Sequence, residues 1–383
     1  MCRARTSSSS SFNYAIFIQA GIYVLSGVTQ PLLMSLAKDA GLANPKCQLY
    51  MLFYYIGPAC VILTFCQQSN NKQVTATTAT ATFNEVSSSG STAVPWKTIV
   101  KIIGIATVDI IAQTMNYTGS TMAGPTIFAI IYSSVTVWCA ILSRLILHRR
   151  MSCLQWIGVL VVFGGLTITA IGSASLGPKV YHGAALVTVG SALHALMYVL
   201  SESVMKTTDM VPMKYCAIFG CVGCAFYFTW QMMYTRTHLA ELVLQPMAEA
   251  DTSYGYAVGI LVSIAIMSLV HSLTFFFTVK HFPGGATSAG VMKALQAVLV
   301  FVATSIVFCG RLGGAEMCFT IAKCISLVVV VVGVLVFGKA TDVINKGEVA
   351  VLQGGNGYKR VDSFGDANDV DLGLDGATKE IEI

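Results

Sequence analysis

Charged residues are scarce in this chain, and their scarcity excludes an ordinary soluble protein. Only 11% of the 383 residues are Asp, Glu, Lys or Arg, whereas 55% are hydrophobic. Soluble globular domains carry about 25% charged residues. The net charge of +5 is spread over the segments between apolar runs, so we expect no nucleic acid as a partner. The composition indicates a polytopic membrane protein whose partner is the lipid bilayer.

The motifs of several functional classes are also missing. The chain contains no HExxH, no paired aspartates of the GxGD form and no Gly-rich phosphate loop. It has no ring-forming filter motif of a channel. Cys221 and Cys224 form a CxxC inside an apolar run without a second pair, so we expect no metal there. We therefore expect neither an enzyme nor a bound cofactor, and a polytopic enzyme or a channel stays as the alternative.

Ten apolar runs dominate what is present. Each approaches or exceeds the roughly 20 residues that a membrane-spanning helix needs. Lipid offers no hydrogen bonds to the backbone, so these runs must be helical. The predicted fold class is an all-α polytopic membrane protein with ten transmembrane helices. The expected spans are 14–37, 46–67, 98–118, 122–147, 152–174, 181–204, 213–235, 254–279, 286–309 and 314–338. The first run is too long for a cleavable signal peptide.

Polar segments flank and interrupt the spans. Residues 1–13 form a short head, and 68–97 are an insertion rich in Ser, Thr, Asn and Ala that we expect to be disordered. Residues 339–383 are a Gly- and Asp-rich tail of the same character. If the N-terminus is cytosolic, most Lys and Arg residues fall on the cytosolic side, as the positive-inside rule requires. The opposite side receives only Lys38, Lys46, Lys179, Arg236 and Arg311.

The two halves of the chain repeat each other. In the first, Gly124-Pro125 begins a span that ends in the basic turn with Arg144 and Arg149, and a Val/Gly-rich span follows. In the second, Gly284-Gly285 begins a span that ends in a turn with Arg311, and a similar span follows. Five spans per half make residues 14–174 and 175–338 two repeats of opposite orientation. Inverted repeats are typical of transporters, with the solute site near the midplane.

Lys293 is a charge within an apolar span, ATSAGVMKALQAVLVFVATSIVFC. Such a charge costs about 2.5–3.5 kcal/mol unless it finds a partner, water or a solute. One interpretation is a lysine whose stem reaches to the cytosolic interface. The other is a cation that faces a solute.

Other polar residues occur at membrane depth. Asp109, Gln113 and Asn116 (or Tyr117) fall near one face of the third span, where they form either a structural ion pair or a solute or proton site. His194 and His271 indicate either hydrogen bonds between helices or proton coupling. Lys323, in the tenth span, is expected to be structural.

The stretch 109–166, with the basic turn RLILHRR and the following QWIGVLVVFGGL, resembles the drug/metabolite transporter superfamily. Within it, the chain is similar to the nucleotide-sugar-transporter-like solute carrier family 35, with the orphan F-type branch as one choice. SAGVMKALQAV is similar to the ninth helix of triose-phosphate and nucleotide-sugar translocators, where a lysine meets substrate phosphate. The resemblance implies ten helices and alternating access.

The chain departs from that pattern next to Lys293. Ala294 and Leu295 stand where the phosphate translocators carry a basic pair, and Tyr132 occupies the position equivalent to Lys293 in the first half. An anionic sugar phosphate is therefore not favoured. We expect a secondary-active carrier of a small polar metabolite, with the solute as partner and a homodimer left open. Its site residues would be Lys293, Asp109, Gln113, Asn116, Tyr132, His271 and His194.

In the carrier, Lys293 would hold an electronegative group of the solute. Asp109 would either pair with Lys293 when the site is empty or carry a coupling proton. Cys309 and Cys318 flank a short loop on the non-cytosolic side, where a disulfide and free thiols are equal alternatives. Tyr358, followed by Val361, resembles an endosomal sorting signal. We expect an endomembrane location, in the Golgi, endosome or a lysosome-like organelle.

We predict that epitope tags at both termini and in the 68–97 insertion all face the cytosol. The reason is the excess of basic residues on that side. Protease treatment of sealed vesicles should digest all three tags, and protection of any one of them would contradict the ten-span arrangement.

Overall fold

The computed structural model describes residues 8–64, 94–123, 128, 131–149, 151–171, 178–282, 284–307 and 321–353. Within them, the side chains of 8–16, 166, 168–171, 178–180, 301, 304, 322, 323, 326, 327, 342 and 344–353 are not described. Most of the 68–97 insertion, the Cys309–Cys318 pair and Tyr358 lie outside these ranges. Met1–Asp342 and Val343–Ile383 form two separate units, and the following concerns the first.

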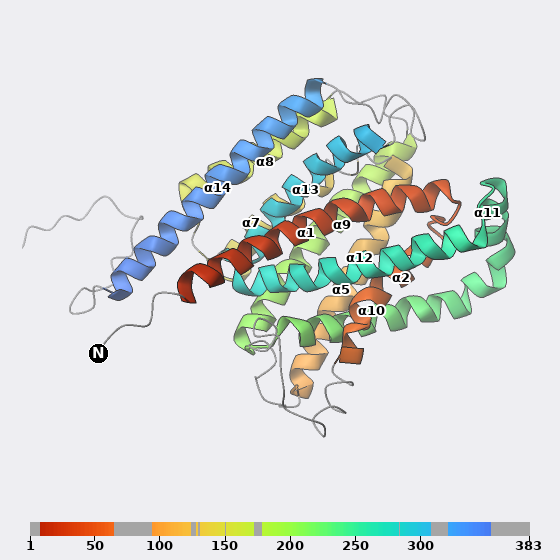
Figure 1. Cartoon of the computed structure of the whole chain (residues 1–383), viewed down its shortest axis with the longest axis horizontal. Helices are drawn as coiled ribbons and strands as arrows, with labels where there is room; N and C mark the ends of the chain where they lie inside the picture. The colour runs from red at the N-terminus through yellow and green to blue at the C-terminus, as the bar shows by residue number, and fades with distance from the viewer. Residues whose placement is uncertain are drawn as a thin grey trace, which may run out of the picture. The chain divides into compact units, whose positions relative to one another are not determined.

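All regular secondary structure in the described ranges is helical, which confirms the all-α prediction there (Figure 1). The first half contains α1 (Ser8–Asp39), α2 (Leu49–Ala59), α5 (Trp96–Ala123), α7 (Val135–Ile146) and α8 (Cys153–Ile171). The second half contains α9 (Pro178–Thr207), α10 (Pro212–Met233), α12 (Tyr254–His281), α13 (Ala286–Val307) and α14 (Ile321–Gln353).

Six of these helices are long and apolar enough to cross a membrane: those over Phe17–Asp39, Trp96–Ala123, Tyr181–Thr207, Pro212–Met233, Tyr254–His281 and Ala286–Val307. The chain is therefore a multi-pass membrane protein. The other four predicted spans overlap only with shorter apolar helices over Leu49–Thr64, Val135–Ile146, Cys153–Gly165 and Val328–Thr341.

Small residues set the closest helix contacts. α5 and α9 pack along much of their length, and a Cβ on Gly183 would lie 2.8 Å from the Ala123 nitrogen and 2.9 Å from the Gly119 oxygen. α8 and α14 lie side by side (Figure 1), where Gly158 and Gly333 meet. Helices in lipid associate through such close backbone contact, because lipid provides little hydrophobic driving force between them.

One region differs from the prediction. The segment between α10 and α12, expected to be a loop, forms the 3₁₀ helix η1 (Thr235–His238), the π-helix η2 (Ala240–Leu244) and α11 (Gln245–Glu249). Leu242, Val243 and Met247 are buried there. The side chain of Gln231 and that of Thr235 donate to the Cys47 carbonyl at 2.7 and 3.0 Å. The segment and the end of α10 are thus hydrogen-bonded to the connection between α1 and α2. Hydrophobic periodicity does not predict helices as short as these.

We predict that Gly183→Val destabilises the protein by about 1–3 kcal/mol, because its side chain has no room against Gly119 and Ala123. Thermal unfolding in detergent measures this. Gly104→Val on α5 is the control, since a Cβ there meets nothing within 4 Å. Equal midpoints for the two variants would contradict close α5–α9 packing.

Candidate functional site

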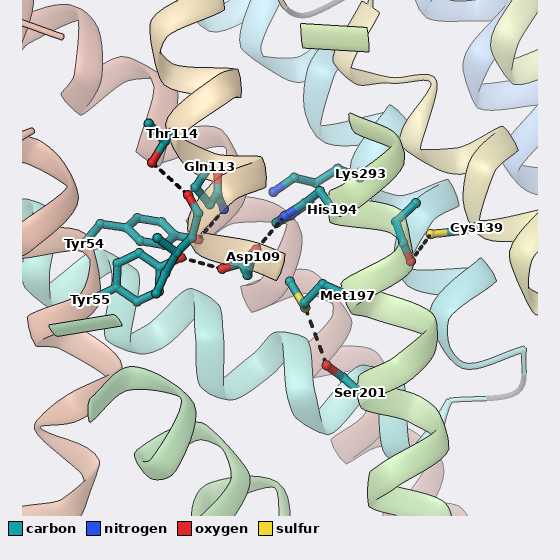
Figure 2. A network of polar contacts seen from close by, with 12 residues as sticks. Tyr54, Tyr55, Asp109, Gln113, Thr114, Cys139, His194, Met197, Ser201 and Lys293 are labelled. Atoms are coloured by element: carbon teal, nitrogen blue, oxygen red, sulfur yellow. Dashed lines mark hydrogen bonds and ion pairs between the residues drawn. The ribbon is translucent and has the colours of Figure 1, made fainter. Parts of the chain in front are cut away.

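Asp109 lies in the middle of α5 and is 1% exposed. Two donors from other helices satisfy its carboxylate. The Tyr55 hydroxyl of α2 donates to Oδ2 at 2.5 Å, and the Nδ1–H of His194 on α9 donates to Oδ1 at 2.8 Å. Figure 2 shows the carboxylate between these two side chains. Charge-assisted hydrogen bonds of this kind are the strongest in proteins, so the group joins three helices.

Lys293 begins a second chain of hydrogen bonds. Its Nζ lies 3.2 Å from Nε2 of His271 on α12, and the Nδ1 of His271 lies 3.1 Å from the Ser26 hydroxyl of α1. An ammonium group only donates, so Nε2 accepts and His271 is the neutral Nδ1–H tautomer. Ser26 in turn donates to the Tyr23 carbonyl at 3.1 Å. The order of donors and acceptors is thereby fixed from α13 to α1.

Tyr132 lies next to both chains. The Lys293 ammonium is 5.8 Å from the centroid of its ring, within the range of a cation–π contact. The same ring is 5.8 Å from that of His194. Tyr132 and Lys293 occupy equivalent positions in the sequences of the two halves, and the structure places them in contact.

One cavity joins these groups. Asp109, His194, His271 and Lys293 all line it, together with Ser272 and Met197. Aromatic rings form much of the remaining wall: Tyr54, Tyr198, Phe219, Phe275 and Phe276. Its volume is about 20 Å³, which is enough for about one water molecule. In this conformation the cavity is therefore too small for a metabolite.

Three predicted site residues, Tyr132, Gln113 and Asn116, are not part of the cavity wall. Gln113 donates to the Tyr54 hydroxyl at 3.4 Å (Figure 2), so it contacts the wall from behind. Asn116 is 2% exposed and lies against Gly190 in the α5–α9 contact. Neither polar atom of its amide has a hydrogen-bond partner. The side chain of Lys323 is outside the described residues.

The expected Asp109–Lys293 ion pair is not the arrangement present. Asp109 pairs with His194 instead, and Lys293 contacts His271. The physical reason is that α2 and α9 already bring two donors to the carboxylate, whereas Lys293 enters from α13 opposite α12. Among the described residues, no group of three or more His, Cys, Asp or Glu could hold a metal ion.

Sequence reasoning missed Tyr54 and Tyr55. Tyr54 and Tyr55 are adjacent in α2, and both of their hydroxyls bond to side chains of α5. Phe275 and Phe276 are buried core residues that also line the cavity. Paired tyrosines in the middle of an apolar span were the available signal, because a buried phenol needs a hydrogen-bond partner.

Just beyond the C-terminal end of α9, the exposed carboxylate of Asp209 pairs with Lys280 of α12. Lys280 donates to Asp209 at 2.8 Å. This hydrogen bond, together with the positive charge, lowers the pKa of the Asp209 carboxyl.

We predict that Asp109→Ala destabilises the protein by about 2–6 kcal/mol, because it leaves the Tyr55 hydroxyl and the His194 N–H buried without an acceptor, at about 1–3 kcal/mol each. Asp109→Asn, which keeps an acceptor, should cost less. Thermal unfolding compares them with Thr107→Ala, an exposed position of the same helix. An Asp109→Ala midpoint equal to that control would refute the argument.

Comparison with known proteins adds the fold alone. No family model matches the chain, and no curated protein is similar to it. A solved structure described as "Crystal structure of protein" superposes with a TM-score of 0.57 over 82% of this chain and 98% of the other. The sequence identity is 15%, so the similarity concerns the arrangement of helices and nothing of the activity.

Proposed function

We propose that the protein is a secondary-active carrier that moves a small polar metabolite across a membrane by alternating access. The observation that carries the proposal is the cavity: a carboxylate, an ammonium and two imidazoles from α5, α9, α12 and α13 line one small space. Ionisable residues at membrane depth are costly and typically mark solute or ion pathways. Here they also come from both halves of the chain.

The contacts support two inverted repeats and hence ten spans. A Cβ on Gly158 would touch Phe337 and the Gly333 oxygen, while a Cβ on Gly333 would touch Val162 and the Gly158 oxygen. Since Val162 and Phe337 each follow their glycine by four positions, the α8–α14 contact is reciprocal. Such reciprocity is the signature of two-fold symmetry. The resemblance to the drug/metabolite transporter superfamily and its solute carrier family 35 agrees with this architecture.

Within this proposal the polar groups divide into two roles. Lys293 has one N–H directed to His271, and its remaining donors can hold an electronegative group of the solute. Asp109 and His194 form the site for a coupling proton, since a buried carboxylate and imidazole in contact can exchange one. Both termini face the cytosol, and the membrane is that of a Golgi, endosomal or lysosome-like compartment.

The small cavity fits a carrier that must change its conformation to admit a solute. Solute entry must then widen a space of about 20 Å³. The widening separates helices of the two halves, which meet through glycines, hydrogen bonds and ring contacts such as Tyr23–Phe275 and Tyr55–Phe219.

We predict that the purified chain is stabilised saturably by one class among nucleotides, sugars, vitamins and amino acids, and that liposomes containing it accumulate that class. Lys293→Met should abolish both effects, because it removes the ammonium at the cavity. Lys101→Met, an exposed position on α5, serves as the control and should leave both unchanged.

Normal uptake by Lys293→Met at normal expression would place the solute elsewhere, first at His271 and His194. A wild-type protein that no solute class stabilises, and that accumulates none, would refute the carrier.

A further inference from the structure

Glu202 is a second buried carboxylate, near the C-terminal end of α9 and away from the cavity. Its side chain is fully buried. The Arg149 guanidinium and the Lys206 ammonium both lie 2.6 Å from Oε1, and the backbone N–H of Ala286 donates to Oε2 at 2.7 Å. Arg149 also donates to the Gly284 carbonyl at 2.5 Å. We call Glu202, Arg149 and Lys206 the charged clamp.

The charged clamp joins the two halves at the start of α13. Arg149 belongs to the connection between α7 and α8, whereas Glu202 and Ala286 belong to the second half. Gly285 has a φ of +50°, and a Cβ there would collide with the Glu202 carboxylate. A glycine therefore permits both the turn into α13 and the approach of the carboxylate. The clamp holds the helix that carries Lys293.

Between the charged clamp and the cavity, α7 and α13 are sealed against each other. Thr287 donates to Ser143 at 3.1 Å, and Thr136 donates to the Gly290 carbonyl at 2.8 Å. Cys139 lies in this contact, fully buried, with its Sγ 3.5 Å from the place of a Cβ on Gly290. From Thr287 to Lys293 the seal spans about 9 Å at 1.5 Å per residue.

A clamp made of charges suits a contact that must open. Burying ions costs hydration energy, and their mutual attraction often only balances that cost. When the clamp separates, Glu202, Arg149 and Lys206 recover water, so the open arrangement is not penalised as an exposed apolar face would be. Closed, the several hydrogen bonds to one carboxylate still specify a single geometry.

We propose that the charged clamp is the cytosolic gate of the carrier, and that release of Glu202 from Arg149 and Ala286 separates α13 from α7 and opens the cavity to that side. The inference rests on the proposed function. It gives Glu202 a role, although Glu202 does not belong to the solute site. The cytosolic side is the side of the membrane to which the positive-inside rule assigns Arg144, Arg149, Lys206 and Lys280.

The test uses Cys139 as a native reporter. The full chain, purified in detergent, is treated with N-ethylmaleimide, and mass spectrometry follows the alkylation rate of each cysteine. Glu202→Gln and Arg149→Gln should each raise the rate at Cys139 by about tenfold, the factor that corresponds to 1.4 kcal/mol. Glu241→Gln and Lys280→Gln are charge-matched controls outside the clamp and should leave that rate unchanged.

Cys216, fully buried in α10 outside the α7–α13 seal, reports on general loosening. A rise at Cys139 with a constant rate at Cys216 supports the gate. Unchanged Cys139 in both clamp variants, or an equal rise at both cysteines, overturns it. Because alkylation needs no solute, an absence of transport by the wild type would refute the carrier without altering this result.

Discussion

The structure depends on the cost of placing a carboxylate where water cannot reach it. Asp109 and Glu202 are both almost fully buried, and a buried charge is tolerated only when it is paired and hydrogen-bonded. Each therefore gathers donors from several segments: Tyr55 and His194 for Asp109, and Arg149, Lys206 and a backbone N–H for Glu202. These requirements, together with the close contacts at glycines, orient the helices relative to one another.

The two carboxylates meet this requirement in different ways. Asp109 has one imidazole and one phenol, which leaves Lys293 free to contact His271 and the cavity. Glu202 has two permanent cations, and both are partly exposed at the edge of the protein. The first arrangement leaves polar groups facing the cavity. The second arrangement is the proposed gate between the cavity and one side of the membrane.

The sequence predicted that the apolar runs are helical, but only six of the described helices are long and apolar enough to cross a membrane. It also identified Lys293, Asp109, His194 and His271, because an ionisable residue within an apolar run stands out. It did not predict which of them pair, since the choice of His194 over Lys293 by Asp109 depends on helix rotation. Nor did it single out Glu202, which lies four residues before Lys206 near a helix end and resembles an ordinary surface pair.

The position of Lys293 follows from both ends of the same helix. At the start of α13, Glu202 accepts the Ala286 N–H, and two turns later Lys293 contacts His271 and Tyr132. A helix is stiff along its axis over so short a distance, so a displacement at Ala286 must also move the ammonium. If α13 tilts away from α7, the Lys293–Tyr132 contact is lost together with the clamp. Lys293, which would hold the solute, and the charged clamp, which would retain it, are thus linked because both act through α13.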